Sequence, residues 1–283
     1  MDGLVWDEQP DLRRPALVAA FKGWNDAGDA ASEAAGWIVR NGGGRRFAWI
    51  DPEEHYDFQS ARPQVELVDG VTRRLTWPTT ECYAVTLDDA SRDLVVVLGV
   101  EPNYRWRSFC RAVVEVATET GCSLTVTLGA LLADVTHTRP PSVTGTASDP
   151  ALVAELELTP SRYEGPTGIV GVLQDSCRAR DLAAVSLWVP VPHYLAGPPH
   201  PVATHALLDR LGRLVDVHFD LDELRAAGDL WRARVDDAIS EDPNAQAYVR
   251  ELESRTQDPE MPLTSGEDLA AELERFLREQ RDD

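Results

Sequence analysis

Lysine is almost absent from this chain. Its 283 residues include one lysine, Lys22, beside 26 arginines and 48 acidic residues. A Walker-type phosphate loop needs a lysine directly after a glycine-rich turn, and Lys22 does not stand in one. The chain also lacks the G-x-G-x-x-G, G-x-S-x-G and H-E-x-x-H patterns of dinucleotide-binding folds, serine hydrolases and zinc proteases. These absences argue against the commonest enzymes of the α/β class.

Long apolar runs and paired cysteines are missing as well. The longest aliphatic run, residues 94–100, is far shorter than the roughly 20 residues of a membrane helix. No apolar leader follows a basic start, and the four cysteines are far apart, without a C-x-x-C pair. We therefore expect reduced, buried thiols and a cytoplasmic protein.

The chain carries a net charge of −21. Nucleic acids and anionic membranes bind clusters of cations, so neither is an expected partner. A chain of this length and composition can bury a large core, and one large domain with an appendage is the expected organisation.

Short apolar runs alternate with helical patterns along the first three quarters of the chain. The alternation predicts a three-layer α/β fold: a largely parallel or mixed sheet with helices on both faces. An Asp69-Gly70 turn between two alternating runs predicts a hairpin. Residues 129–150 are expected to form a long irregular loop. The predicted strands are 16–21, 46–50, 64–68, 71–77, 82–87, 93–100, 123–128 and 183–189, and helices are predicted after residue 25, at 104–120, before Arg180 and at 201–215.

The last quarter of the chain has a different pattern. Residues 219–283 contain 19 acidic residues and 8 arginines, and show no strand signal. Helical spacing predicts helices at 222–240, 243–256 and 267–281, the last with an apolar stripe of Leu269, Leu273, Phe276 and Leu277. We predict an α/β domain of residues 1–218 and an acidic helical region of residues 219–283.

Polar residues gather where the predicted strands end, which is where open α/β sheets bind ligands. They form a candidate pocket, although the same acids can cap helices and the same charges can be solvated. The spacing of His193, His200 and His205 does not suit a metal site. No catalytic residue, metal or cofactor is predicted. The candidate pocket residues are Lys22, Trp24, Asn25, Asp26, Glu101, Asn103, His137, Arg139 and His193.

Four segments that contain these residues occur in an order and at a spacing that resemble those of the proteasome assembly chaperone 2 family in its actinobacterial form. They are Phe-Lys-Gly-Trp-Asn-Asp-Ala-Gly at 21–28, Gly-Val-Glu-Pro-Asn-Tyr-Arg-Trp at 99–106, Asp-Val-Thr-His-Thr-Arg-Pro at 134–140 and Val-Pro-His-Tyr at 191–194. The resemblance spans roughly residues 15–215. It implies a fold similar to purine nucleoside phosphorylases and self-association, as a homotrimer or another small oligomer.

The resemblance also implies a non-catalytic role through protein–protein contacts, with proteasome subunits as candidate partners. Eukaryotic members dock through a hydrophobic-Tyr-any tail. This chain ends Gln-Arg-Asp-Asp at 280–283, so docking through such a tail is not expected. Two alternatives stay open: an enzyme or small-ligand binder that uses a phosphorylase-like pocket, and an acidic tail that builds the oligomer.

Overall fold

A computed structural model describes residues 3–254 apart from 89, 148 and 159–163. Its centre is an eight-stranded mixed sheet with the strand order β1-β3-β6-β7-β2-β8-β10-β9. The bounds are β1 Leu4–Trp6, β2 Ala16–Lys22, β3 Arg45–Ile50, β6 Thr80–Val85, β7 Leu94–Val100, β8 Leu124–Ala133, β9 Thr144–Ala147 and β10 Ala184–Pro192. The four central strands β7, β2, β8 and β10 are parallel, and their flanking strands are antiparallel.

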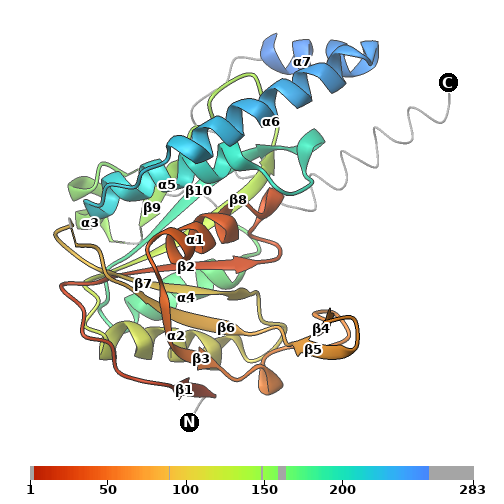
Figure 1. Ribbon diagram of the computed structural model, residues 1–283. Helices are drawn as coiled ribbons and strands as arrows, with labels where there is room; N and C mark the ends of the chain where they lie inside the picture. The colour runs from red at the N-terminus through yellow and green to blue at the C-terminus, as the bar shows by residue number, and fades with distance from the viewer. Residues whose placement is uncertain (1–2, 89, 148, 159–163, 255–283) are drawn as a thin grey trace.

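Helices cover both faces of this sheet (Figure 1). Alternate residues of β2 belong to different cores: Val18 lies in the core that contains α1, and Leu17 in the core that contains α2. Because both faces are covered, all of β2 except Lys22 is buried, which explains its continuous apolar sequence. The helices of the α/β part are α1 Ala30–Asn41, α2 Trp106–Glu119, α3 Pro150–Glu155, α4 Ile169–Arg178 and α5 Pro201–Val215. The predicted three-layer α/β class is confirmed.

Two further helices follow α5. Helix α6, Asp222–Ser240, has the predicted bounds, and α7 spans Pro243–Ser254. Helix α6 runs along α5 (Figure 1), and Gly228 of α6 lies against Val202 of α5. The predicted helix at 267–281 lies outside the described residues, and the division into two domains stays a prediction. No helix among the described residues has both the length and the apolar content to cross a bilayer.

The predicted hairpin is also present. Strands β4, Gln64–Val68, and β5, Thr72–Thr76, form a two-stranded sheet of their own. Asp69 and Gly70 both have positive φ angles, as the tight connection requires. All four cysteines are buried and free of disulfides, as predicted.

The prediction of an irregular loop at 129–150 holds for residues 134–143 but was wrong for 129–133 and 144–147. Strand β8 continues to Ala133 and pairs with β10 over nine residues, and β9 adds a further strand at Thr144–Ala147. The run Gly-Ala-Leu-Leu-Ala at 129–133 has weak strand propensity, but its pairing with β10 stabilises the extended backbone. Gly129 leaves room for the Trp188 ring, which belongs to the paired residue on β10.

This contact makes Gly129 sensitive to substitution. A Cβ at position 129 would lie 2.6 Å from ring atoms of Trp188, so Gly129→Ala must displace the indole or the strand. We expect the free energy of unfolding in urea to fall by about 1–3 kcal/mol. Gly197→Ala is the control because nothing lies within 4 Å of its added Cβ. Equal stability of the two variants would contradict the proposed overpacking.

Candidate functional site

Four loops lie at one edge of the sheet, where the parallel strands end. Lys22 pairs with Val100 at the ends of β2 and β7, and Ala133 pairs with Pro192 at the ends of β8 and β10. The loops that follow these strands, at 23–29, 101–105, 134–143 and 193–199, are named the carboxyl-edge loops here. Together with Lys22, they hold all nine residues of the candidate pocket.

Asp26 serves the start of α1. Its Oδ1 accepts hydrogen bonds from the backbone N–H groups of Ala31 (2.7 Å) and Ser32 (3.1 Å), which would otherwise lack partners at the helix N-terminus. Burial raises the pKa of Asp26, and the hydrogen bonds from Ser32 and Ala31 oppose that rise. Its Oδ2 is buried without a hydrogen-bond partner among the described atoms. The structural role that the sequence allowed for Asp26, helix capping, is present.

Asn25 and Glu101 form a second pair, which joins two loops to a third element. Asn25 Nδ2 donates to Glu101 Oε1 at 3.1 Å, and the same oxygen accepts from the N–H of Ile169 at 2.8 Å. Ile169 is the first residue of α4, so Glu101 caps this helix from 68 residues earlier in the chain. The carboxylate also stands at the positive end of the helix dipole.

Lys22 and Trp24 face outward. Lys22 Nζ lies 3.3 Å from Asp29 Oδ2, and the lysine side chain is 51% exposed. Trp24 is 55% exposed. Asn103 is also exposed, and its Oδ1 accepts from the backbone N–H of Asp57 at 2.8 Å. These three side chains do not converge with Asp26 and Glu101 on one enclosed space.

His137 belongs to a separate cluster on the other side of the edge. Its backbone N–H donates to Tyr194 Oη (3.0 Å), which in turn lies 2.6 Å from His137 Nδ1. The Asp236 carboxylate can only accept, so His137 Nε2 donates to its Oδ1 at 3.0 Å, and in the neutral ring Nδ1 is then the acceptor for the Tyr194 hydroxyl. Burial raises the pKa of Tyr194 to about 12, which keeps this donor protonated. Asp236 lies on α6, so the network ties α6 to the loop after β8.

His193 and Arg139 tie α7 to the same edge. Tyr248 Oη lies 2.8 Å from His193 Nε2, while His193 Nδ1 lies 3.2 Å from Asp134 Oδ1. Arg139 Nη2 donates to the backbone oxygen of Glu253 at 2.7 Å. Tyr248 and Glu253 are both on α7.

The nine candidate residues thus form several groups, and their polar atoms mostly hold the fold together. Asp236, Tyr248 and Glu253 were not predicted from the sequence, because their partners are about 55 to 115 residues away in the chain. Tyr248, the single aromatic residue of α7, was the signal available in the sequence.

His200 forms a further contact between α5 and α6. Its Nδ1 accepts from the N–H of Ala203 (3.2 Å) and so caps α5, while its ring lies 4.3 Å from that of Trp231 on α6. Burial lowers the pKa of His200 from 6.5 to about 4. The buried ring is neutral at physiological pH.

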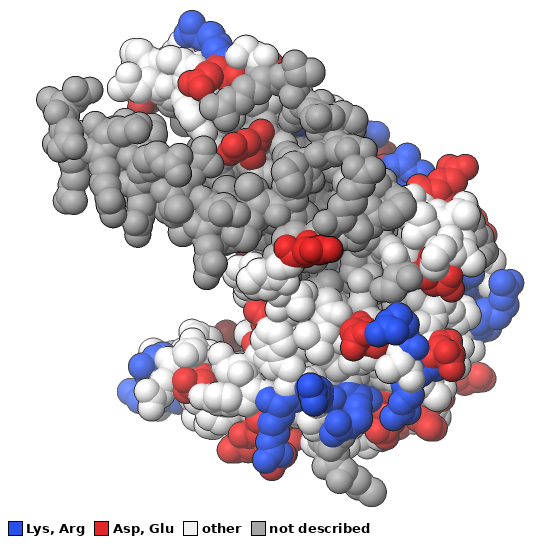
Figure 2. All heavy atoms as spheres, turned by 180° about the vertical axis from the view of Figure 1, so that it is seen from behind, with Lys and Arg blue, Asp and Glu red and all other residues white. Residues whose placement is uncertain are grey.

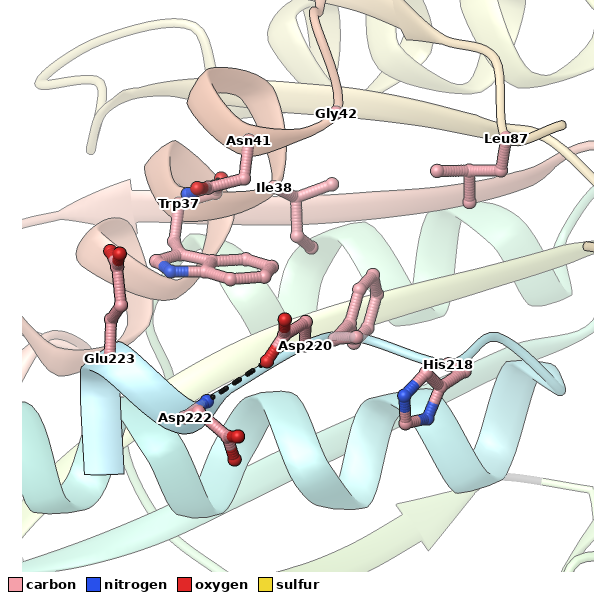
Figure 3. A pocket seen from close by; sticks show the side chains of 10 residues that line it. Trp37, Ile38, Asn41, Gly42, Leu87, His218, Asp220, Asp222 and Glu223 are labelled. Carbon is pink, nitrogen blue, oxygen red and sulfur yellow. Dashed lines mark hydrogen bonds between the residues drawn. The ribbon is translucent and has the colours of Figure 1, made fainter. Parts of the chain in front are cut away.

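A pocket of about 360 Å³ lies at the opposite, amino-terminal edge of the parallel strands (Figure 3). Trp37 and Phe219 meet edge to face at 5.8 Å in its wall. Carboxylates come from the chain just before and at the start of α6, where Asp220 accepts a hydrogen bond from the N–H of Asp222 at 3.2 Å. Its lining residues are Trp37, Ile38, Asn41, Gly42, Leu87, His218, Phe219, Asp220, Asp222 and Glu223.

Comparison with known proteins assigns the chain to a protein family. The model of the PAC2 family matches residues 20–239, which is more than half of the chain. The chain belongs to the PAC2 family. No protein in the comparison with curated sequences matches it.

Two actinobacterial structures are similar to this PAC2 family chain. A PAC2 family protein of Streptomyces avermitilis is 49% identical, with a TM-score of 0.78, and the match covers 83% of this chain and 99% of that one. A proteasome-assembly chaperone homologue of Mycobacterium tuberculosis is 43% identical, with a TM-score of 0.76 and the same coverage. The predicted family and its actinobacterial character are confirmed.

A more distant structure shares the fold of the PAC2 family chain. PbaB of Pyrococcus furiosus, an archaeal proteasome activator, has a TM-score of 0.66 at 17% identity, covering 83% of this chain and 97% of that one. At this identity the likeness concerns the fold alone.

Buried His200 makes the stability of this PAC2 family protein depend on pH. The unfolded chain takes up a proton near pH 6.5, whereas the folded chain keeps His200 neutral down to about pH 4. The unfolded state therefore binds more protons in this window, and stability is lost as the pH falls from 6.5 to 4. The shift corresponds to about 3 kcal/mol.

We expect His200→Asn, which keeps a side-chain oxygen for capping α5, to flatten the fall in stability between pH 7 and pH 4. Urea denaturation at several pH values measures this pH dependence of the free energy of unfolding. His218→Asn is the control, since His218 is exposed in the folded chain. An unchanged slope in His200→Asn would contradict the assignment.

Proposed function

We propose that this protein is a non-catalytic, chaperone-like binding factor that acts through protein–protein contacts, with proteasome subunits as its partners. Family membership supports the proposal, together with the name of the 43% identical M. tuberculosis homologue of proteasome-assembly chaperones. Self-association and a cytoplasmic location remain predictions.

The observation that carries the proposal is an exposed aromatic pair on neighbouring carboxyl-edge loops. Trp24 and Tyr104 are each 55% exposed. Their loops adjoin, because the N–H of Glu101 donates to the oxygen of Lys22 at 2.8 Å. Exposed Arg105 and Arg107 lie one and three residues after Tyr104. Trp, Tyr and Arg are the residues that most often dominate the energetics of protein–protein interfaces.

The internal use of the polar groups supports binding over catalysis. Asp26 and Glu101 accept hydrogen bonds from helix N-termini, and His137 and His193 hold α6 and α7. A general base must instead reach the proton of a bound substrate. The side chains that remain available at this edge are the ones suited to contact with another protein.

Trp24→Ala tests this surface. We expect the affinity for proteasome subunits, measured by calorimetry or surface plasmon resonance, to fall by about 30-fold or more, because a buried interface tryptophan contributes about 2 kcal/mol or more. The melting temperature should stay unchanged, since Trp24 is exposed.

Leu230→Ala is the control, because Leu230 is 64% exposed on α6 and belongs to none of the carboxyl-edge loops. It should bind as the wild type does. Equal affinity of Trp24→Ala and the wild type would place the interface elsewhere, and no binding by the wild type would refute the choice of partner.

Small-ligand binding is the second candidate function, and the pocket in Figure 3 favours it. Its volume is within the range of ligand sites. Aromatic rings beside Asp220 and Glu223 suit an organic cation, through cation–π attraction and charge pairing, and disfavour phosphate-bearing ligands.

Thermal shift assays distinguish these ligand classes. We expect a polyamine such as spermidine to stabilise the chain by about 2.7 kcal/mol at about 100 times its Kd, and AMP or phosphate to give no shift. Trp37→Ala should remove the spermidine shift. A shift that survives in Trp37→Ala would mean that the polyamine binds elsewhere on this acidic chain.

A further inference from the structure

The β4–β5 hairpin exposes one apolar face. Val65 pairs with Leu75, and Leu67 lies two residues beyond Val65, so all three side chains point to the same side. Their exposed fractions are 56%, 58% and 65%. The hairpin projects as a lobe from the body of the molecule, at the right in Figure 1 and at the lower left in the reverse view of Figure 2.

An isolated hairpin of this kind is not stable by itself. Two strands in water are marginal unless a third strand or a helix covers their apolar face. Among the described residues, the hairpin has no backbone pairing with the main sheet. At its base Trp77 meets Phe58 edge to face at 4.9 Å, which fixes the root of the hairpin but leaves the face of Val65, Leu67 and Leu75 exposed.

The charge of the hairpin differs from that of the whole chain. Residues 62–77 contain three arginines and two acidic residues, whereas the chain as a whole carries a net charge of −21. Arg73 stands on the same side as Leu67, its partner across the ladder. An acidic amphipathic segment would therefore complement this face in both polarity and charge.

The chain contains one such segment outside the described residues. In residues 267–281 the spacing of Leu269, Leu273, Phe276 and Leu277 matches one face of an amphipathic helix. Residues 255–283 contain nine acidic residues and four arginines. The twelve residues from 255 to 266 can span up to about 40 Å.

We propose that residues 267–281 bind the apolar face of the β4–β5 hairpin in the same chain, with the leucine and phenylalanine stripe against Val65, Leu67 and Leu75. The contact supplies the third element that the hairpin needs. It also makes the segment an internal competitor for any partner that binds this face.

Disulfide trapping tests the contact in the full-length chain. All four native cysteines are buried, so introduced cysteines react selectively. We expect Leu67→Cys with Leu273→Cys to form a disulfide within one chain under mild oxidation. Thr72→Cys with Leu273→Cys is the control, because Thr72 pairs with Val68 and points to the opposite side. Equal trapping in both pairs, or trapping only as covalent dimers, would overturn the proposal.

Hydrogen exchange provides a second measurement that needs no cross-link. We expect Leu273→Asp to increase amide exchange in residues 64–76 by tenfold or more, while exchange in β7 stays unchanged. Ala271→Asp introduces the same charge on the opposite side of the helical pattern and should leave exchange at the wild-type rate. Wild-type exchange in Leu273→Asp would overturn the proposal.

Discussion

The parallel pairing of β7, β2, β8 and β10 determines most of what is seen in this protein. Strands buried on both faces carry mostly apolar side chains, and parallel connections usually cross over the sheet through helices. Both requirements place the polar residues of the α/β part beyond the strand ends. The carboxyl edge is therefore polar because of the architecture, before any selection for a binding site.

Helix N-termini at this edge then require acceptors. Each helix begins with N–H groups that have no partner within the helix. Asp26 supplies an acceptor to α1, Glu101 to α4 and His200 to α5. The two carboxylates of the candidate pocket, Asp26 and Glu101, are thus explained as helix caps, and His200 is a third cap outside that pocket. This use of carboxylate and imidazole groups leaves Trp24 and Tyr104 as the distinctive exposed features of the edge.

The sequence predicted local features well. Strand β2, the β4–β5 hairpin and α6 follow from apolar periodicity, the Asp-Gly turn and helical spacing, all of which act over a few residues. It failed at residues 129–133, where pairing with β10 determines the conformation and local propensity does not. It could place Glu101 at the correct edge, but it could not find Ile169 as its partner, 68 residues later. The contact of His137 with Asp236 could not be predicted for the same reason, because the two residues are 99 positions apart in the chain.

Helices α6 and α7 supply partners to polar groups of the carboxyl edge that would otherwise be unpaired. His137 is buried and its ring proton needs an acceptor, which α6 supplies through Asp236; His193 is satisfied on one side by Tyr248 of α7. Removal of α6 and α7 would leave these polar groups short of partners, at a cost of about 1–3 kcal/mol each. The packing of Val249 and Leu252, the buried residues of α7, would also be lost. The described helices of the tail therefore complete the carboxyl edge, and the residues available for contact with other proteins are those that this completed edge leaves exposed.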